Sequence, residues 1–105
     1  GYDNNFCLYK KDFTLQEAAV LEHKESGRVL EVFTDLPGIQ LYCGGWLAKQ
    51  GNPGKANGKV TYRRGAALET QFYPDTVHFA DAFPSRFVKA NEEFKTTTEF
   101  RFSVK

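Results

Sequence analysis

The stretch "TEFRFSVK", residues 98–105, alternates apolar and polar side chains along its whole length. Its apolar positions are Phe100, Phe102 and Val104, with charged or hydroxyl side chains between them. Successive side chains of an extended strand point to opposite faces, so this period of two places the apolar residues on one face. Such a pattern is typical of a β-strand that covers a core on one side and meets water on the other. The end of the chain therefore predicts a half-buried strand.

Earlier segments follow the same pattern, and none holds an apolar period of 3.6 residues for three turns. "EAAVLEH" and "RVLEVFTD" are joined by "KESG", which predicts a β-hairpin with Gly27 in the tight turn. "QEAAVLEH" also contains good helix formers, so a short helix stays open there. The strand pattern and the aromatic content of 15% together predict an all-β fold.

Two further stretches, "PGIQLYCGGWL" and "LETQFYPD", place polar side chains on one face of a predicted strand. Gln40 and Tyr42 share a face in the first, and Glu69, Gln71 and Tyr73 share a face in the second. A carboxylate, carboxamides and phenols suit a polyhydroxylated ligand, because they both donate and accept hydrogen bonds. A solvated sheet face with no ligand is the alternative interpretation.

Composition narrows the classes of function. The 105 residues make one domain or part of one, and 14 Lys and Arg against 13 Asp and Glu leave a net charge of +1. A balanced charge argues against binding to nucleic acid or to a membrane surface. The sequence has no apolar run long enough to span a bilayer, no signal-peptide pattern and no Asn-x-Ser/Thr sequon, so we expect a cytoplasmic protein.

The residue types that bind metals or act as nucleophiles are sparse and scattered. Cys7 and Cys43 lie in apolar stretches without a Cys-x-x-Cys motif, which favours buried free thiols, with one disulfide as the alternative. His23 and His78 lack the spacing of a metal pair and are expected at the surface. We predict no metal and no cofactor. The polar residues left for chemistry are Asp3, Gln40 and Glu69, a set that fits sugar recognition.

At these three positions the sequence resembles the aldose 1-epimerases, also called galactose mutarotases. "GYDNNF" is similar to the family's Gly-Tyr-Asp-His segment, and "PGIQLYCGGWL" to its Pro-Gly-hydrophobic-Gln stretch. "LETQFYPD" resembles the Glu-Thr-Gln-His-Tyr-Pro-Asp signature, and "FPSRFVKANEEFKTTTEFRFSV" the closing segment. The resemblance runs in the same order from Gly1 to the end. The sequence departs from the family pattern at Phe72, where a histidine is usual, and at Gly45, where many members have asparagine.

The resemblance implies an antiparallel β-supersandwich and interconversion of the α and β anomers of a free hexose such as galactose or glucose. Glu69 matches the catalytic base, while Asp3 and Gln40 match residues that bind the sugar's hydroxyls. The family's acid is a histidine from a segment before "GYD", and neither His23 nor His78 lies in a matching motif.

Residues 1–105 are therefore expected to be an incomplete C-terminal portion of an aldose 1-epimerase-like domain. Its expected partners are a monosaccharide and the upstream part of the same protein, or a second chain that carries that part. We expect residues 1–105 alone to be inactive. A non-catalytic carbohydrate-binding or sugar-sensing member of the same superfamily is the alternative function, and an unrelated oligonucleotide-binding barrel is a third.

Overall fold

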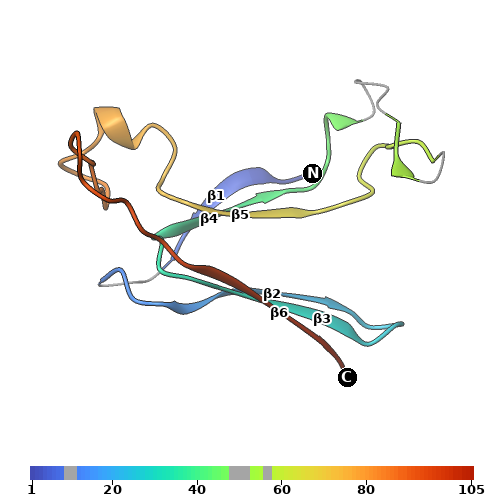
Figure 1. The fold of residues 1–105 in the computed structure, drawn as a ribbon. Helices are drawn as coiled ribbons and strands as arrows, with labels where there is room; N and C mark the ends of the chain where they lie inside the picture. Colours follow the sequence, from blue (N-terminus) through green and yellow to red (C-terminus); the bar gives the residue numbers. More distant parts are fainter. Residues whose placement is uncertain (9–11, 48–52, 56–57) are drawn as a thin grey trace.

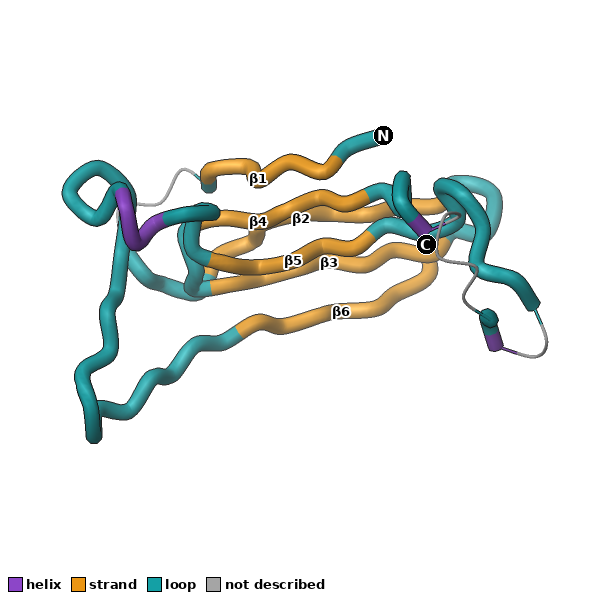
Figure 2. The backbone as a smooth tube through the Cα atoms, turned by 90° about the horizontal axis from the view of Figure 1, so that it is seen from above, coloured by secondary structure: helices purple, strands orange, loops and turns teal. Residues whose placement is uncertain are grey.

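The computed structural model describes residues 1–8, 12–47, 53–55 and 58–105 as two antiparallel β-sheets. One sheet has the strand order β1-β4-β5 and the other has the order β2-β3-β6, and the two lie over one another (Figures 1 and 2). This arrangement confirms the all-β prediction. The elements in chain order are β1 (Asp3–Cys7), β2 (Gln16–His23), β3 (Arg28–Thr34), β4 (Gly38–Tyr42), β5 (Ala67–Gln71), the 3-10 turn η3 (Thr76–His78) and β6 (Thr98–Val104).

The predicted hairpin is confirmed, and the segment that could have been a helix is strand β2. It pairs with β3 from Gln16 opposite Thr34 to His23 opposite Arg28, with a bulge near Ala18. Gly27 closes the turn with a φ of 68°. A Cβ on Gly27 would lie 2.3 Å from the carbonyl oxygen of Lys105, so both the backbone angle and the close approach require glycine. Pairing with β3 therefore outweighs the helix propensity of this segment.

Threonine hydroxyls join the two sheets at one end. The Thr98 hydroxyl of β6 lies 2.6 Å from that of Thr70 on β5 and 3.4 Å from that of Thr34 on β3. Asp35 follows β3 and accepts a hydrogen bond of 3.0 Å from the backbone N–H of Thr97. The buried apolar residues of the described segments are Val29, Val32, Leu36 and Ile39. Leu36 lies beside this junction, whereas Val29 lies near the other end of β3.

Away from this junction the two sheets diverge, and apolar side chains are left exposed (Figure 1). Residues 98–104 form a strand as predicted, but the prediction that its apolar face is buried was wrong, because Phe102 is 78% exposed and Val104 is 74% exposed. The chain has 8191 Å² of accessible surface, whereas a closed monomer of this length has about 5,900 Å². Its radius of gyration is 16.5 Å, against about 13 Å for a compact domain. The sandwich is therefore open at this end.

The expectation for the cysteine thiols needs correction. Cys7 and Cys43 are free, but Cys7 is exposed and Cys43 only half-buried, so the prediction of buried thiols was wrong. Cys7 lies opposite Gly38 in the β1–β4 ladder, and glycine has no side chain to cover it. The pairing of β4 with β5 is regular from Gly38 opposite Gln71 to Tyr42 opposite Ala67. Residues 49–59 are rich in glycine, asparagine, proline and lysine and lie partly outside the described residues; where they are described, Pro53 pairs with Lys59.

Candidate functional site

The outer face of the β1-β4-β5 sheet brings the polar residues of three separate segments into adjacent rows. The register places Asn5 opposite Gln40 and Gln40 opposite Glu69, so these three side chains form one row across the sheet. Cross-strand partners project from the same face. Asp3 is two residues before Asn5, and Gln71 is two residues after Glu69, so both lie on that face as well.

Side-chain amides connect these rows. The Gln40 Nε2 donates to Asp3 Oδ1 at 2.7 Å. The Gln71 Nε2 donates to Gln40 Oε1 at 3.0 Å and to Asn5 Oδ1 at 3.2 Å. We refer to these four residues, Asp3, Asn5, Gln40 and Gln71, as the amide network. It joins all three strands of the sheet and holds Gln40 at both ends of its carboxamide.

Gly38 makes the network possible, because Asn5 and Gln71 meet across strand β4 at this residue. A Cβ on Gly38 would lie 2.7 Å from Asn5 Oδ1, closer than real Cβ atoms approach a neighbour, and 3.0 Å from Tyr73 Cδ1, which is a tight contact. The glycine therefore provides the space in which Asn5 and the ring of Tyr73 sit beside β4. The glycine of the Pro-Gly pair thus shapes the polar face.

Glu69 lies directly across from Gln40 on the outer strand β5. The side chain is exposed, and its carboxylate makes no hydrogen bond or ion pair with any residue that the structure describes. The neighbouring Gln40 carboxamide, in contrast, is fixed by two partners. The face therefore presents an uncommitted carboxylate beside a fixed amide, which is a suitable arrangement for exchanging a proton with a bound hydroxyl.

An aromatic residue borders the amide network at the end of β5. Tyr73 lies against Gly38 and packs edge-on against Phe83, with ring centroids 5.3 Å apart. Burial raises the pKa of the Tyr73 phenol above its usual value, and the neighbouring Cys7 thiol raises that pKa further. The phenol therefore keeps its proton to a higher pH than an ordinary tyrosine.

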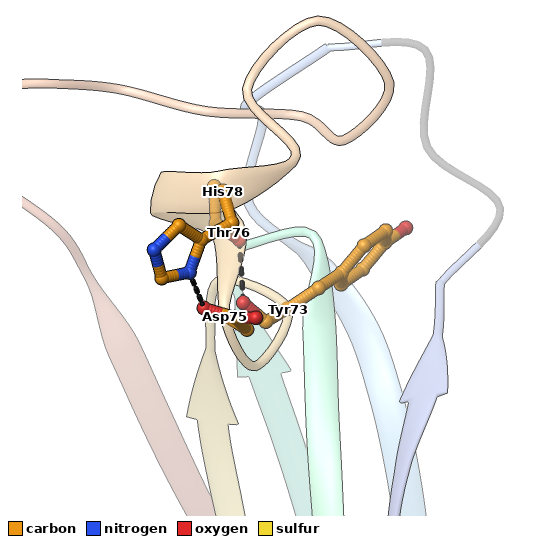
Figure 3. A network of polar contacts seen from close by, with 4 residues as sticks. All are labelled: Tyr73, Asp75, Thr76 and His78. Atoms are coloured by element: carbon orange, nitrogen blue, oxygen red, sulfur yellow. Dashed lines mark hydrogen bonds and ion pairs between the residues drawn. The ribbon is translucent and has the colours of Figure 1, made fainter.

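Neither histidine of the chain belongs to this face. The His78 Nδ1 pairs with Asp75 Oδ1, Thr76 donates its hydroxyl hydrogen to the Tyr73 carbonyl, and the Tyr73 ring points away from His78 (Figure 3). His23 is the last residue of β2, on the other sheet, and its Nδ1 is 2.9 Å from the Ser26 hydroxyl. Both imidazoles are therefore at the surface, as expected. Among the described residues, no three His, Cys, Asp or Glu side chains gather closely enough to hold a metal ion.

The structure thus brings the three sequence-predicted residues, Asp3, Gln40 and Glu69, onto one face, and their roles stay predictions. The sequence did not single out Asn5, although its position two residues after Asp3 in a strand was available as a signal. Gln71 was placed on the correct face but given no role. The contact between Asn5 and Gln71 depends on the β1–β4–β5 register, which the sequence does not reveal.

The family model of aldose 1-epimerase matches residues 1–101 of this chain. The chain belongs to the aldose 1-epimerase family. It is 42% identical over 105 residues to the galactose mutarotase of Mus musculus, and 43% identical over 105 residues to that of Homo sapiens, in each case over 99% of this chain. It is 31% identical to the aldose 1-epimerase of Escherichia coli K12 over 103 residues, or 97% of this chain. The chain spans about 30% of the length of these relatives.

Two positions where this aldose 1-epimerase family member departs from the expected motif lie apart from the amide network. Phe72 packs against Phe13 and Phe94, with ring centroids 6.0 Å and 6.4 Å away, and so joins an aromatic cluster. Gly45 is half-buried, and a Cβ there would meet no atom within 4 Å. Neither departure changes a contact of Glu69 or Gln40. No helix in the described part of the chain is long and apolar enough to cross a membrane.

Proposed function

We propose that this chain is the C-terminal part of an aldose 1-epimerase that interconverts the α and β anomers of a free hexose such as galactose or glucose. The observation that carries the proposal is the uncommitted Glu69 carboxylate beside the fixed Gln40 amide. Family membership and the names of the relatives support it. We place the whole protein in the cytoplasm on the sequence evidence alone.

In this proposal Glu69 is the base and takes the proton from the hydroxyl on the anomeric carbon, C1. The C1–O5 bond breaks as C1 becomes an aldehyde, and the ring oxygen takes a proton from an acid. Rotation about the C1–C2 bond then presents the other face of the carbonyl. Ring closure reforms the C1–O5 bond, the ring oxygen gives its proton back to the acid, and Glu69 returns its proton to O1. Glu69 ends the cycle as the same ionised carboxylate with which it began.

The acid in this scheme is a histidine from an upstream segment of the same protein or from a second chain. The positions of the two histidines described above support this choice, because His78 pairs with Asp75 and His23 ends strand β2 of the other sheet. Asp3 and Gln40 would bind the sugar's remaining hydroxyls. Asp3 has a second carboxylate oxygen, and Gln40 has a second N–H and a second lone pair.

Polarimetry on the full-length protein tests the function directly. Freshly dissolved α-galactose or α-glucose should reach its equilibrium rotation much faster with the protein than in buffer alone. A rate equal to that of buffer, together with saturable sugar binding, would instead support the non-catalytic carbohydrate-binding alternative. That alternative is favoured by one observation, the lack of an acid facing Glu69 among the described residues.

Replacement of Asp3 or Gln40 by alanine should raise KM for galactose in the full-length protein. Each lost hydrogen bond costs about 0.5 to 3 kcal/mol, which corresponds to about a twofold to 150-fold increase. The effect of Gln40→Ala should be at least as large as that of Asp3→Ala, because Gln40 bonds to both Asp3 and Gln71. Initial rates over a range of galactose concentrations measure both. Unchanged KM in both variants would contradict this placement of the sugar.

A further inference from the structure

The donors and acceptors of the amide network can be assigned from chemistry alone. An ionised carboxylate only accepts hydrogen bonds, so Asp3 requires the Nε2 side of the Gln40 carboxamide. The Oε1 of Gln40 must then face the opposite way, toward Gln71. That oxygen also only accepts, so Gln71 must present its Nε2. The charge on Asp3 therefore sets a single direction for the whole chain of hydrogen bonds.

Gln71 is the donor that completes this chain. Its Nε2 has two hydrogens, and two amide oxygens lie within hydrogen-bond distance, Gln40 Oε1 at 3.0 Å and Asn5 Oδ1 at 3.2 Å. Both N–H groups are therefore directed at protein atoms. Gln71 is half-buried, whereas Glu69, two residues earlier on the same face, is exposed. Gln71 is thus placed to hold Gln40.

We propose that Gln71 is a positioning residue that acts through Gln40, holding that carboxamide in the direction that Asp3 sets, so that its free N–H and its oxygen are presented to a sugar. This inference rests on the proposed function. Without the Gln71 donor, Gln40 would be held only by Asp3 and could leave the face, and ordering it would then oppose sugar binding. The effect should appear in binding and not in the proton transfer at Glu69.

Two substitutions at Gln71 separate this role from general support of the fold. Gln71→Leu has a similar size and no donor, and it should raise KM for galactose in the full-length protein by about threefold to tenfold, with kcat within about twofold. Gln71→Glu replaces the donor by an acceptor. Its carboxylate would face Gln40 Oε1, and turning the Gln40 amide would only move the repulsion to Asp3.

The Gln71→Glu variant also carries a pH signature. The surrounding acceptor oxygens favour the protonated carboxyl, so the pKa of the new group should be raised. Protonation restores an O–H donor, so the ratio of KM in the variant to KM in the parent should fall as the pH is lowered from about 8 to about 5. A role in folding alone would not predict this recovery.

Asn5→Asp is the matched control. It adds a carboxylate to the same network, but Asn5 already serves as an acceptor for Gln71, so the direction of the hydrogen bonds is kept. The side-chain amide NMR signals of Gln40, recorded without sugar, should stay close to the parent positions in Asn5→Asp. In Gln71→Glu at neutral pH they should shift and exchange faster with water. This readout needs no activity.

The outcomes distinguish the two proposals. Unchanged KM in Gln71→Leu, a KM ratio in Gln71→Glu that does not depend on pH, or unmoved Gln40 amide signals in Gln71→Glu would each overturn the positioning role. If the parent protein neither binds nor interconverts galactose, the proposed function fails. The Gln40 amide signals then test whether Gln71 holds Gln40. A shift in Gln71→Glu but not in Asn5→Asp would support this role, and no shift in Gln71→Glu would overturn it.

Discussion

Replacing Glu69 with glutamine in the full-length protein should lower kcat for anomer interconversion by about a hundredfold to ten-thousandfold, the usual contribution of a general acid or base. Glutamine has nearly the same shape but does not take up a proton at neutral pH. The structure offers few other consequences of the change, because the Glu69 carboxylate is exposed and bonds to no other described residue. The thermal midpoint should therefore stay near that of the parent, and KM should change by much less than kcat.

Polarimetry on freshly dissolved α-galactose measures this loss, and each rate is divided by the concentration of folded protein. Glu25→Gln is a suitable control, because Glu25 is an exposed glutamate in the β2–β3 turn, on the other sheet. The control should keep the parent rate, which excludes an effect of charge alone. A Glu69→Gln variant that equilibrates the anomers as fast as the parent would show that Glu69 is not the base.

The fold class could be predicted from local patterns, because the alternation of apolar and polar residues indicates a strand without knowledge of its neighbours. The alternation in Thr98–Val104 and the tight turn at Gly27 were enough to predict β6 and the β2–β3 hairpin. Residues 16–23 show where propensity is insufficient. Good helix formers in this segment adopt a strand because β3 supplies hydrogen-bond partners, and helix propensity takes no account of such partners.

The candidate site could be predicted only as separate residues on predicted strand faces. The family resemblance picked out Asp3, Gln40 and Glu69, and strand alternation placed Gln71 on the polar face. The amide network depends instead on a register that joins residues up to 66 positions apart, and on the space above Gly38. Cys7 was misjudged for the same reason, since an apolar neighbourhood in sequence does not fix which face of the strand is covered.

Residues 1–105 expressed alone should associate or precipitate and should show no epimerase activity. The reason is one face of the β2-β3-β6 sheet, on which Phe100 is 48%, Phe102 is 78% and Val104 is 74% exposed. Leu21 extends this face on β2 and is 46% exposed. Contiguous apolar surface of this kind drives association in water unless other protein covers it. In the part of the chain that the structure describes, β1, β2, β5 and β6 are edge strands and add unpaired sheet edges.

We expect the upstream segment to cover this face. A double substitution tests this, because it should improve the behaviour of residues 1–105 alone and destabilise the full-length protein. In residues 1–105 alone, Phe102→Lys with Val104→Lys should reduce association, because it removes apolar surface from water and adds charge. In the full-length protein the same pair should lower the thermal midpoint, because it would bury two charges against the covering segment. Ser103→Lys, on the opposite face of β6, should have little effect in either context.

Sedimentation velocity on residues 1–105 and a reconstitution assay with the separately expressed upstream segment measure the two halves of this prediction. Addition of the upstream segment should both restore a discrete, soluble species and produce anomer interconversion, because it supplies the missing acid together with the missing cover. The Glu69→Gln form of residues 1–105 should restore the soluble species without the activity, which separates assembly from catalysis. A monomeric chain of 105 residues with a cooperative melt and full activity would contradict the proposal, and the proton donor would then have to come from within this sequence.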